Sequence, residues 1–273
     1  MQIRKYLSAM FAASLFTGAS FANAAAPIDV TWNPFGAGIS TQGPFTFDNV
    51  LINTYSNIDI TSGGTAFTEQ GFARFTVFSD NGFPTAIPTS GFPAGTPYSL
   101  YVSFTATGTQ TAGLPSTGSF TSLNYSLLAA PGVTTFADSN NDGIFEVTGL
   151  PTITLATGSL IGGTVSLTGT VFTPLPAAQI LTTFVPNPAF ATFFVNPNAS
   201  TVLDLTAAFV TTSTELTLIP LNNNGDIRIS LNGGGGNATF AVSAVPEPDT
   251  YGMLLAGLGL FGFIARRRRQ KAA

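Results

Sequence analysis

The chain has 273 residues, of which 8% are charged, and it contains neither histidine nor cysteine. Between residues 25 and 245 the only basic residues are Arg74 and Arg228, so this central part offers no basic surface that would bind nucleic acid. The missing His, Cys and central Lys also exclude a zinc site and the Ser–His, Cys–His and Ser–Lys nucleophiles.

The N-terminus is predicted to be a secretory signal peptide over residues 1–24. Arg4 and Lys5 form a positive start, residues 6–21 are mostly apolar, and Ala22-Asn23-Ala24 is a small-residue cleavage site. We expect an apolar signal helix that signal peptidase removes by cutting after Ala24. The central part of the chain would then fold outside the cytoplasm.

Residues 25–242 are predicted to form a β-rich extracellular domain, because polar and apolar residues alternate along many short segments. The clearest alternation has a period of two, lies in segments 98–105, 164–171 and 226–231, and is typical of half-buried strands. Weaker strand candidates are segments 45–52, 55–60, 72–78, 121–127, 216–218 and 239–242. We therefore expect an all-β fold of antiparallel strands, arranged as a β-sandwich or a jelly roll.

Three further segments are interpreted from local composition. Segments 177–184 and 202–209 are the only candidates for short helices in this domain. The glycine run at residues 233–236 is predicted to be a turn between the last two strands, because it lacks the helix start and the basic partner that a phosphate site needs.

The segment 138–146 resembles the first half of a calcium-binding loop. Oxygen-bearing side chains stand at its positions one, three and five, and glycine follows at position six, but the bidentate Glu usual at position twelve is missing. The expected ligands are Asp138, Asn140, Asp142, the Ile144 carbonyl and Glu146. The alternative is a hairpin turn whose Asn and Asp side chains hydrogen-bond their own backbone.

Carboxylates are the side chains left for acid–base catalysis. A glycosidase would need a pair of them, and Glu69, Glu146 and Glu215 are candidates that the sequence does not pair. We therefore expect no enzymatic activity. Among the aromatic residues, Trp32 is a candidate for stacking on a sugar, and the alternative for it is a position in the core.

The C-terminal segment 243–273 combines a linker, a proline-containing loop, an apolar stretch and a cationic end. In Val245-Pro246-Glu247-Pro248 each proline fixes its own φ and keeps the preceding residue extended, which presents the Glu247 carboxylate for recognition. Residues 251–265 are predicted to form a short transmembrane helix of roughly 22 Å, against a hydrocarbon core of about 30 Å. The run Arg266-Arg267-Arg268-Arg269 would stop it at the cytoplasmic side.

This order of a Pro-Glu-Pro triplet, a glycine-rich apolar segment and an arginine-rich end resembles the C-terminal sorting segment of bacterial PEP-CTERM proteins. The resemblance covers residues 245–269, with Asp249 where such proteins often carry Ser. It implies cleavage near the triplet by the membrane enzyme exosortase, in bacteria that produce exopolysaccharide. The run 97–109 and the loop at 138–146 are also similar to a flocculation-associated group of these proteins.

The resemblance implies an exported protein that passes through the inner membrane and remains at the cell surface, at the outer membrane or in the extracellular matrix. Its expected partners are signal peptidase, exosortase and exopolysaccharide, with a role in biofilm or floc formation and no nucleic acid. The alternatives are a calcium-dependent carbohydrate-binding module and a carboxylate-based glycosidase. Calcium is the only cofactor that the sequence suggests.

Overall fold

The computed structural model describes residues 26–61, 63–149, 152–170, 173–211, 216–221 and 226–243. The predicted signal peptide with Ala22 and Ala24, the residue Glu215 and the predicted sorting segment from Val245 onward lie outside these residues. All described strands belong to one compact unit, Ala24–Val242. Within the described residues, no helix has the length and apolar character needed to span a membrane.

The described part of the chain consists of strands and two single-turn 3-10 helices. A three-stranded sheet contains β1 (Val30–Trp32), β2 (Phe45–Phe47) and β12 (Phe194–Asn196), and β8 (Thr135–Ala137) pairs with β9 (Glu146–Thr148). The large sheet contains β3 (Asn49–Ile60), β4 (Ala66–Asp80), β5 (Phe83–Ala86), β6 (Tyr98–Gln110), β7 (Ser116–Pro131), β10 (Ile153–Thr170), β11 (Thr173–Pro186), β13 (Leu203–Val210), β14 (Leu216–Pro220) and β15 (Ile227–Val242). The helices are η1 (Pro88–Ser90) and η2 (Pro188–Phe190).

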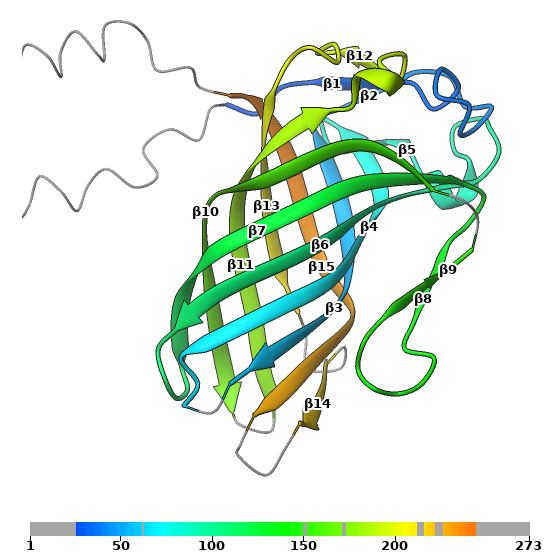
Figure 1. Cartoon of the computed structure of the whole chain (residues 1–273). Coiled ribbons are helices and arrows are strands. Elements are labelled where there is room, and N and C mark those ends of the chain that lie inside the picture. Colours follow the sequence, from blue (N-terminus) through cyan, green and yellow to red (C-terminus); the bar gives the residue numbers. More distant parts are fainter. Residues whose placement is uncertain are drawn as a thin grey trace, which may run out of the picture. The chain divides into compact units, whose positions relative to one another are not determined.

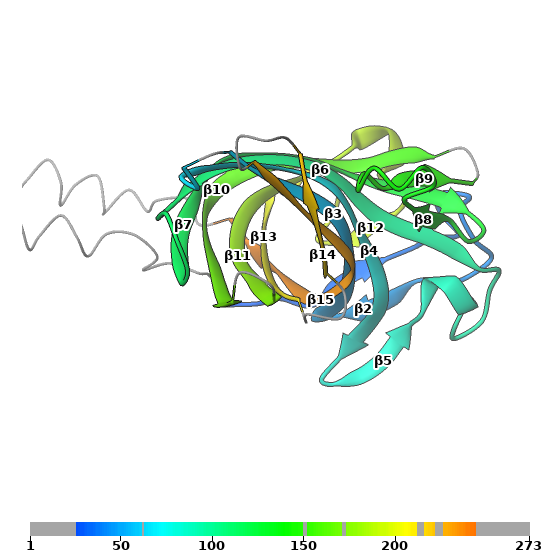
Figure 2. The same cartoon turned by 90° about the horizontal axis from the view of Figure 1, so that it is seen from below.

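Eight strands of the large sheet close into a barrel, in the order β3-β4-β6-β7-β10-β11-β13-β15, with β15 paired back to β3. Neighbouring strands are antiparallel and follow one another along the chain, which makes an up-and-down barrel. Figure 2 shows the barrel strands arranged in a ring. The predicted all-β antiparallel fold is confirmed, but its arrangement is a barrel rather than a sandwich or jelly roll. Alternation reveals one buried face per strand, which suits a closed sheet and two stacked sheets equally well.

The three segments with the clearest alternation form strands as predicted, with residues 98–105 in β6, 164–170 in β10 and 227–231 in β15. The two predicted short helices are strands instead: residues 177–184 lie in β11, and residues 203–209 lie in β13. These strands pair antiparallel from Ala177 opposite Val210 to Phe184 opposite Leu203, and β13 also pairs with β15. A helix at either place would leave strand edges unpaired, so closure of the barrel overrides the local preference of alanine.

The glycine run predicted as a turn lies inside β15. A β-bulge interrupts the pairing of β15 with β3 between Asn232 and Gly234, and Gly233 there has a φ of 93°, which favours glycine. On one side of the bulge β15 pairs with β13, and on the other side it pairs with β14. The glycines therefore let one long strand bend and change its partner, a role that composition alone does not distinguish from a turn.

An aromatic cluster lies where the three-stranded sheet covers one end of the barrel, uppermost in Figure 1. Trp32 of β1 is only 1% exposed and lies at the centre of this cluster. Its ring is 4.9–6.3 Å, between centroids, from those of Phe47, Phe75, Phe78, Phe184, Phe193, Phe194 and Phe240. We call Trp32 and these seven phenylalanines the aromatic plug. The core interpretation of Trp32 is thus confirmed, and its indole is not available to stack on a sugar.

Candidate functional site

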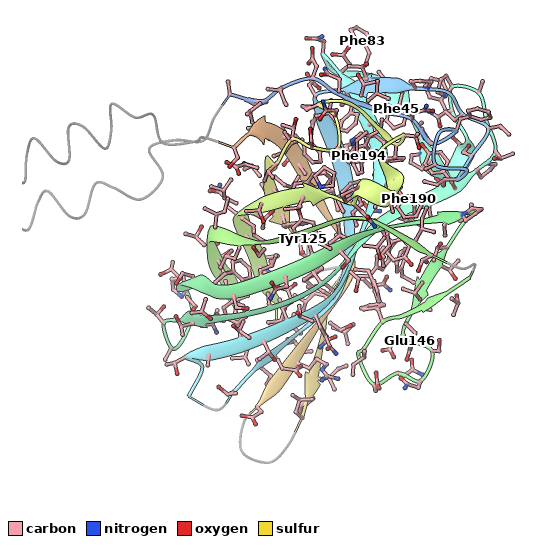
Figure 3. All side chains as sticks on the ribbon, turned by 45° about the horizontal axis from the view of Figure 1, so that its top comes forward. Phe45, Phe83, Tyr125, Glu146, Phe190 and Phe194 are labelled. Carbon is pink, nitrogen blue, oxygen red and sulfur yellow. The ribbon has the colours of Figure 1, made fainter. Side chains whose placement is uncertain are left out.

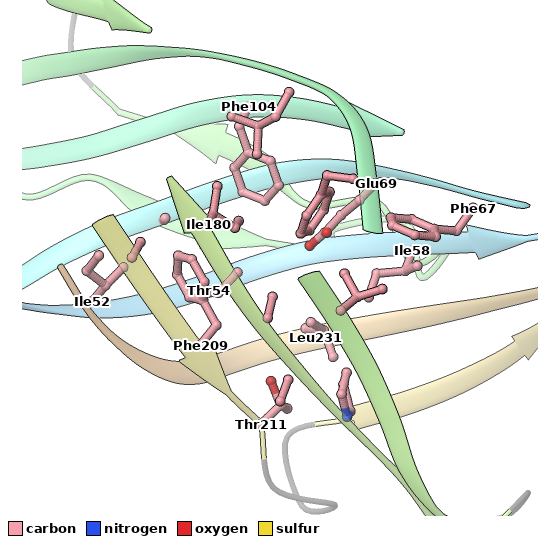
Figure 4. A pocket seen from close by; sticks show the side chains of 18 of the residues that line it. Ile52, Thr54, Ile58, Phe67, Glu69, Phe104, Ile180, Phe209, Thr211 and Leu231 are labelled. Atoms are coloured by element: carbon pink, nitrogen blue, oxygen red, sulfur yellow. The ribbon is translucent and has the colours of Figure 1, made fainter. Parts of the chain in front are cut away.

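The barrel interior contains a cavity of about 120 Å³ beside the aromatic plug. All eight barrel strands contribute to its lining, so the cavity belongs to the barrel as a whole (Figure 4). Small side chains such as Ala73, Ala178 and Ala207 stand in the wall where larger ones would fill the space. The cavity is the site for which the described residues make the strongest case, because it is concave, apolar and built by a rigid scaffold.

The lining is mostly apolar and contains many aromatic rings. Phe67, Phe104, Phe120, Tyr125 and Phe209 lie among aliphatic residues from every wall of the barrel. Polar residues are a minority of the described lining, and among these described residues only Glu69 has a carboxyl group. None of the described lining residues is basic, so the charge of Glu69 has no counterion in the wall.

Glu69 faces the cavity because it lies on the inward face of β4, two residues after Phe67. Its register neighbours are Ile58 of β3 and Ala106 of β6. The Ser56 hydroxyl donates a hydrogen bond to its Oε1 atom at 2.8 Å. Burial raises the pKa of Glu69 to about 7, and the hydrogen bond from Ser56 partly opposes this rise. The carboxyl is therefore poised to gain or lose its proton near neutral pH.

Tyr125 is the other titratable residue of the described lining. Its hydroxyl donates to the Thr183 carbonyl at 2.8 Å, across from β7 to β11. Burial raises the pKa of Tyr125 above its ordinary value, so its hydroxyl stays protonated at neutral pH. Tyr125 thus fixes the wall and leaves Glu69 as the group in the lining that changes charge.

The loop predicted to bind calcium connects β8 and β9. Both carboxylate oxygens of Asp138 accept backbone N–H groups, from Asp142 at 3.0 Å and from Gly143 at 2.8 Å. Asp142 Oδ1 accepts the N–H of Ile144 at 2.7 Å. Within the described ranges, no group of three or more Asp, Glu, His or Cys side chains is arranged to hold a metal ion. These hydrogen bonds are those of the hairpin-turn alternative, and calcium binding stays a prediction.

The two other predicted side-chain ligands are also engaged within the loop. Asn140 Oδ1 accepts the N–H of Asp142 at 3.1 Å, and Glu146 Oε2 accepts the N–H of Ser139 at 3.0 Å. Moreover, the guanidinium of Arg228 donates to the Asp142 carbonyl at 2.9 Å, which brings a protein cation to the loop.

The β8–β9 hairpin is fixed to the outer wall of the barrel. Phe136 of β8 lies 5.0 Å from Tyr55, 5.2 Å from Tyr101 and 5.4 Å from Phe72, measured between ring centroids. Arg228 of β15 adds a second attachment, since it also forms a bidentate ion pair with Asp59 of β3. The Nε–Oδ1 distance is 2.6 Å and the Nη2–Oδ2 distance is 2.7 Å.

The structure does not bring the described glycosidase candidates together. Glu69 points into the barrel, whereas Glu146 lies on the β8–β9 hairpin outside the barrel wall (Figure 3). Glu215 lies outside the described residues. A paired-carboxylate mechanism therefore has no geometric support among the residues described.

Sequence reasoning named Glu69 but did not place it in a cavity. The signal was present, because Phe67, Glu69, Ala73 and Phe75 share the inward face of one strand with a period of two. Whether that face meets a packed core or an open space depends on the other seven strands of the barrel.

Comparison with known families gives one match, and it lies beyond the barrel. Residues 244–269 match the model of the PEP-CTERM protein-sorting motif. No curated protein and no solved structure matches the chain significantly. The match supports export and processing by exosortase, as the sequence predicted. The chain therefore carries a PEP-CTERM protein-sorting motif at residues 244–269.

Proposed function

We propose that this protein is exported, processed by exosortase, and then acts without catalysis as a binding protein for a small, mostly apolar molecule. The observation that carries the binding proposal is the cavity inside the barrel. Barrels of eight strands either fill their interior with side chains or hold one small ligand. This barrel is filled at the aromatic plug and has space beside it.

The energetics of packing support a ligand in this space. The apolar side chains around the space of about 120 Å³ have no protein atoms to pack against on that side. A small apolar molecule restores the missing van der Waals contacts and removes its own apolar surface from water. Binding to the folded protein should therefore raise its unfolding temperature.

The absence of catalysis is part of the proposal. The described cavity wall presents one carboxyl group and no basic residue, so it lacks the second carboxylate that a glycosidase pairs with the first. An apolar wall whose described titratable groups are Glu69 and a Tyr125 that stays protonated is better suited to holding a molecule than to transforming it.

Two neighbouring alanines of β13 provide a matched test of ligand binding. Ala207 lines the cavity, whereas Ala208 is not in its lining. In Ala207→Leu the added carbons fill part of the space, and in Ala208→Leu they lie outside it. We expect hexanol to raise the unfolding temperature of the processed wild-type protein and of Ala208→Leu, and to have little effect on Ala207→Leu.

The readout is thermal unfolding of protein recovered from producing cells, over a series of hexanol concentrations. The Ala207→Leu protein without ligand should be as stable as wild type or more stable, because its cavity is smaller. An equal response of all three proteins to hexanol, or no response in wild type, would contradict binding in the cavity.

The proposal also covers where the exported protein acts. The sorting motif supports export and processing. We propose further that the protein associates with exopolysaccharide at the cell surface or in the matrix and contributes to biofilm or floc formation, as the resemblance to PEP-CTERM proteins implies. With Trp32 buried, the candidates for stacking on a polysaccharide become the exposed aromatics of the described part, which are Phe35 at 66%, Phe83 at 75% and Phe92 at 42% exposure. Phe83 lies at the rim of the molecule in Figure 3.

A strain that lacks the gene tests the proposed role in biofilm and floc formation. We expect it to form fewer flocs and less biofilm than its parent, and complementation with the full chain should restore both. Complementation with Glu247→Ala should not, if processing at the motif is required. The intact mass of the recovered protein reports that processing directly. A deletion strain that flocculates normally would refute the matrix role without affecting the cavity proposal.

A further inference from the structure

The cavity contains an acidic group without a balancing cation. Among the described residues that line it, Glu69 is the only acidic residue and none is basic. Its hydrogen-bond partner is the neutral hydroxyl of Ser56, at 2.8 Å from Oε1. An ionised Glu69 is therefore an uncompensated negative charge in an apolar space, which is costly until a cation pairs with it.

Aromatic rings flank this carboxyl. Phe67 precedes it by two residues on the same face of β4, and Phe104 of β6 lies opposite Gly71, which makes it a diagonal neighbour of Glu69. Figure 4 shows Glu69 turned into the cavity, with Phe67 and Phe104 seen on either side of it. Aromatic faces attract cations through the ring quadrupole, most strongly where water is displaced. The rings and the carboxylate therefore favour the same kind of charge.

We propose that the cavity selects an apolar molecule that carries a single amine, with the ammonium group against Glu69 and the apolar body along the remaining wall. This proposal rests on the ligand-binding function proposed above and specifies its ligand class. An apolar carboxylate would be repelled by ionised Glu69. An apolar alcohol would fit the wall but leave the negative charge unpaired.

The protonation of Glu69 gives the proposal a pH dependence. Burial raises the pKa of Glu69 to about 7, as expected for a carboxyl that has no cation beside it. An ammonium ion binds the ionised form better, so amine affinity should rise between about pH 5 and about pH 8. Tyr125 is the other titratable lining residue, and burial keeps it protonated across this range.

Three ligands with the same alkyl chain test the selectivity: hexylamine, hexanol and hexanoate. Affinities are measured by calorimetry on the processed protein recovered from producing cells, with Glu69→Gln and, as a control carboxyl outside the barrel, Glu146→Gln. At about pH 8 we expect hexylamine to bind wild type and Glu146→Gln about tenfold more tightly than hexanol, with hexanoate weakest. In Glu69→Gln the preference for the amine should disappear, and the pH dependence of amine binding should disappear with it.

The outcomes separate the two proposals. If hexanol binds as tightly as hexylamine at about pH 8, or if Glu69→Gln keeps the amine preference, the selectivity proposal is wrong while ligand binding stands. If none of the three ligands binds wild type, ligand binding itself fails. Thermal unfolding of each variant verifies that it is folded before its affinities are compared.

Discussion

The aromatic plug and the cavity are two parts of one barrel interior that share Phe75 but differ in their other side chains. At the plug, Trp32 and seven phenylalanines pack ring against ring. At the cavity the eight barrel strands contribute alanine, threonine and a carboxyl group as well as rings, and about 120 Å³ is not filled. This difference leads us to propose different roles for the two regions: the plug stabilises the barrel, and the cavity binds a ligand.

The largest effect is expected at the plug. Trp32→Ala removes a ring that contacts seven others, so we expect it to lower the free energy of unfolding by about 3–5 kcal/mol. Phe35, at 66% exposure, is the matched control, and Phe35→Ala should change that free energy by less than about 0.5 kcal/mol. Urea unfolding measures both. Equal losses in the two variants would show that the plug is not the main source of stability.

The cavity should make the stability of the barrel depend on pH, through Glu69. Its pKa is about 7 in the folded protein against an ordinary value of 4.5, so between these values the folded state binds more protons than the unfolded state. This contribution to stability is fully present below about pH 4.5 and is lost as the pH rises through about 7, by an amount on the order of 3 kcal/mol.

Glu69→Gln isolates that contribution. Urea unfolding of both proteins at several pH values measures it. As the pH rises, the unfolding free energy of wild type should fall relative to that of Glu69→Gln. A difference that stays constant across this range would mean that Glu69 is not buried as the structure places it.

Substitutions of Arg228 test whether the outer wall contributes as much to the free energy of unfolding as the plug or the cavity does. Its side chain is 12% exposed and forms an ion pair with Asp59. The hydrogen bond to Asp59 raises the pKa of Arg228 above its ordinary value. Arg228→Met leaves Asp59 unpaired and frees the Asp142 carbonyl, so we expect a loss of about 1–3 kcal/mol. Arg228→Lys keeps the charge without the bidentate geometry and should lower the free energy of unfolding by less.

Urea unfolding measures both variants, and proteolysis gives a second readout. In Arg228→Met, cleavage between β8 and β9 should become faster. Unchanged stability in both variants would exclude a structural role for the Arg228–Asp59 pair.

The smallest effect is expected from calcium. The oxygens of Asp138, Asn140, Asp142 and Glu146 already accept backbone N–H groups. We therefore expect the unfolding temperature to be the same with calcium and with a chelator. A rise with calcium that Asp138→Ala and Asp142→Ala both abolish would establish the calcium loop predicted from the sequence.

Local patterns predicted much of the wall of the barrel but not its closure. Alternation in segments 98–105, 164–171 and 226–231 identified strands because each has one buried face. The alanine-containing segments 177–184 and 202–209 were wrongly predicted to be helices, because the strand conformation of residues 177–184 and 203–209 depends on their pairing with each other. The glycine run at 233–236 was misread for a related reason, because a bulge inside a long strand has the same composition as a turn.

The candidate site was harder to predict than the fold. The sequence left Trp32 open between stacking on a sugar and a position in the core, and the packing of rings from β2, β4, β11 and β15 shows that it is buried. Glu69 was noted as an isolated carboxylate, but its significance comes from a space that eight strands enclose together. The sorting motif, in contrast, depends on a short contiguous stretch, and residues 244–269 could be recognised directly.

The pairing of β3 with β15 has a consequence for the order of synthesis. The first and last strands of the barrel meet along Ile60 opposite Ile227 to Val50 opposite Ala238, so the ring cannot close until almost the whole domain has been made. A chain that stops before residue 227 would have an open sheet with bare edges at β3 and β13, which invites aggregation. The sorting motif begins at residue 244, directly after β15. In this gene product, the sorting motif is therefore completed only after every strand that closes the barrel has been synthesised.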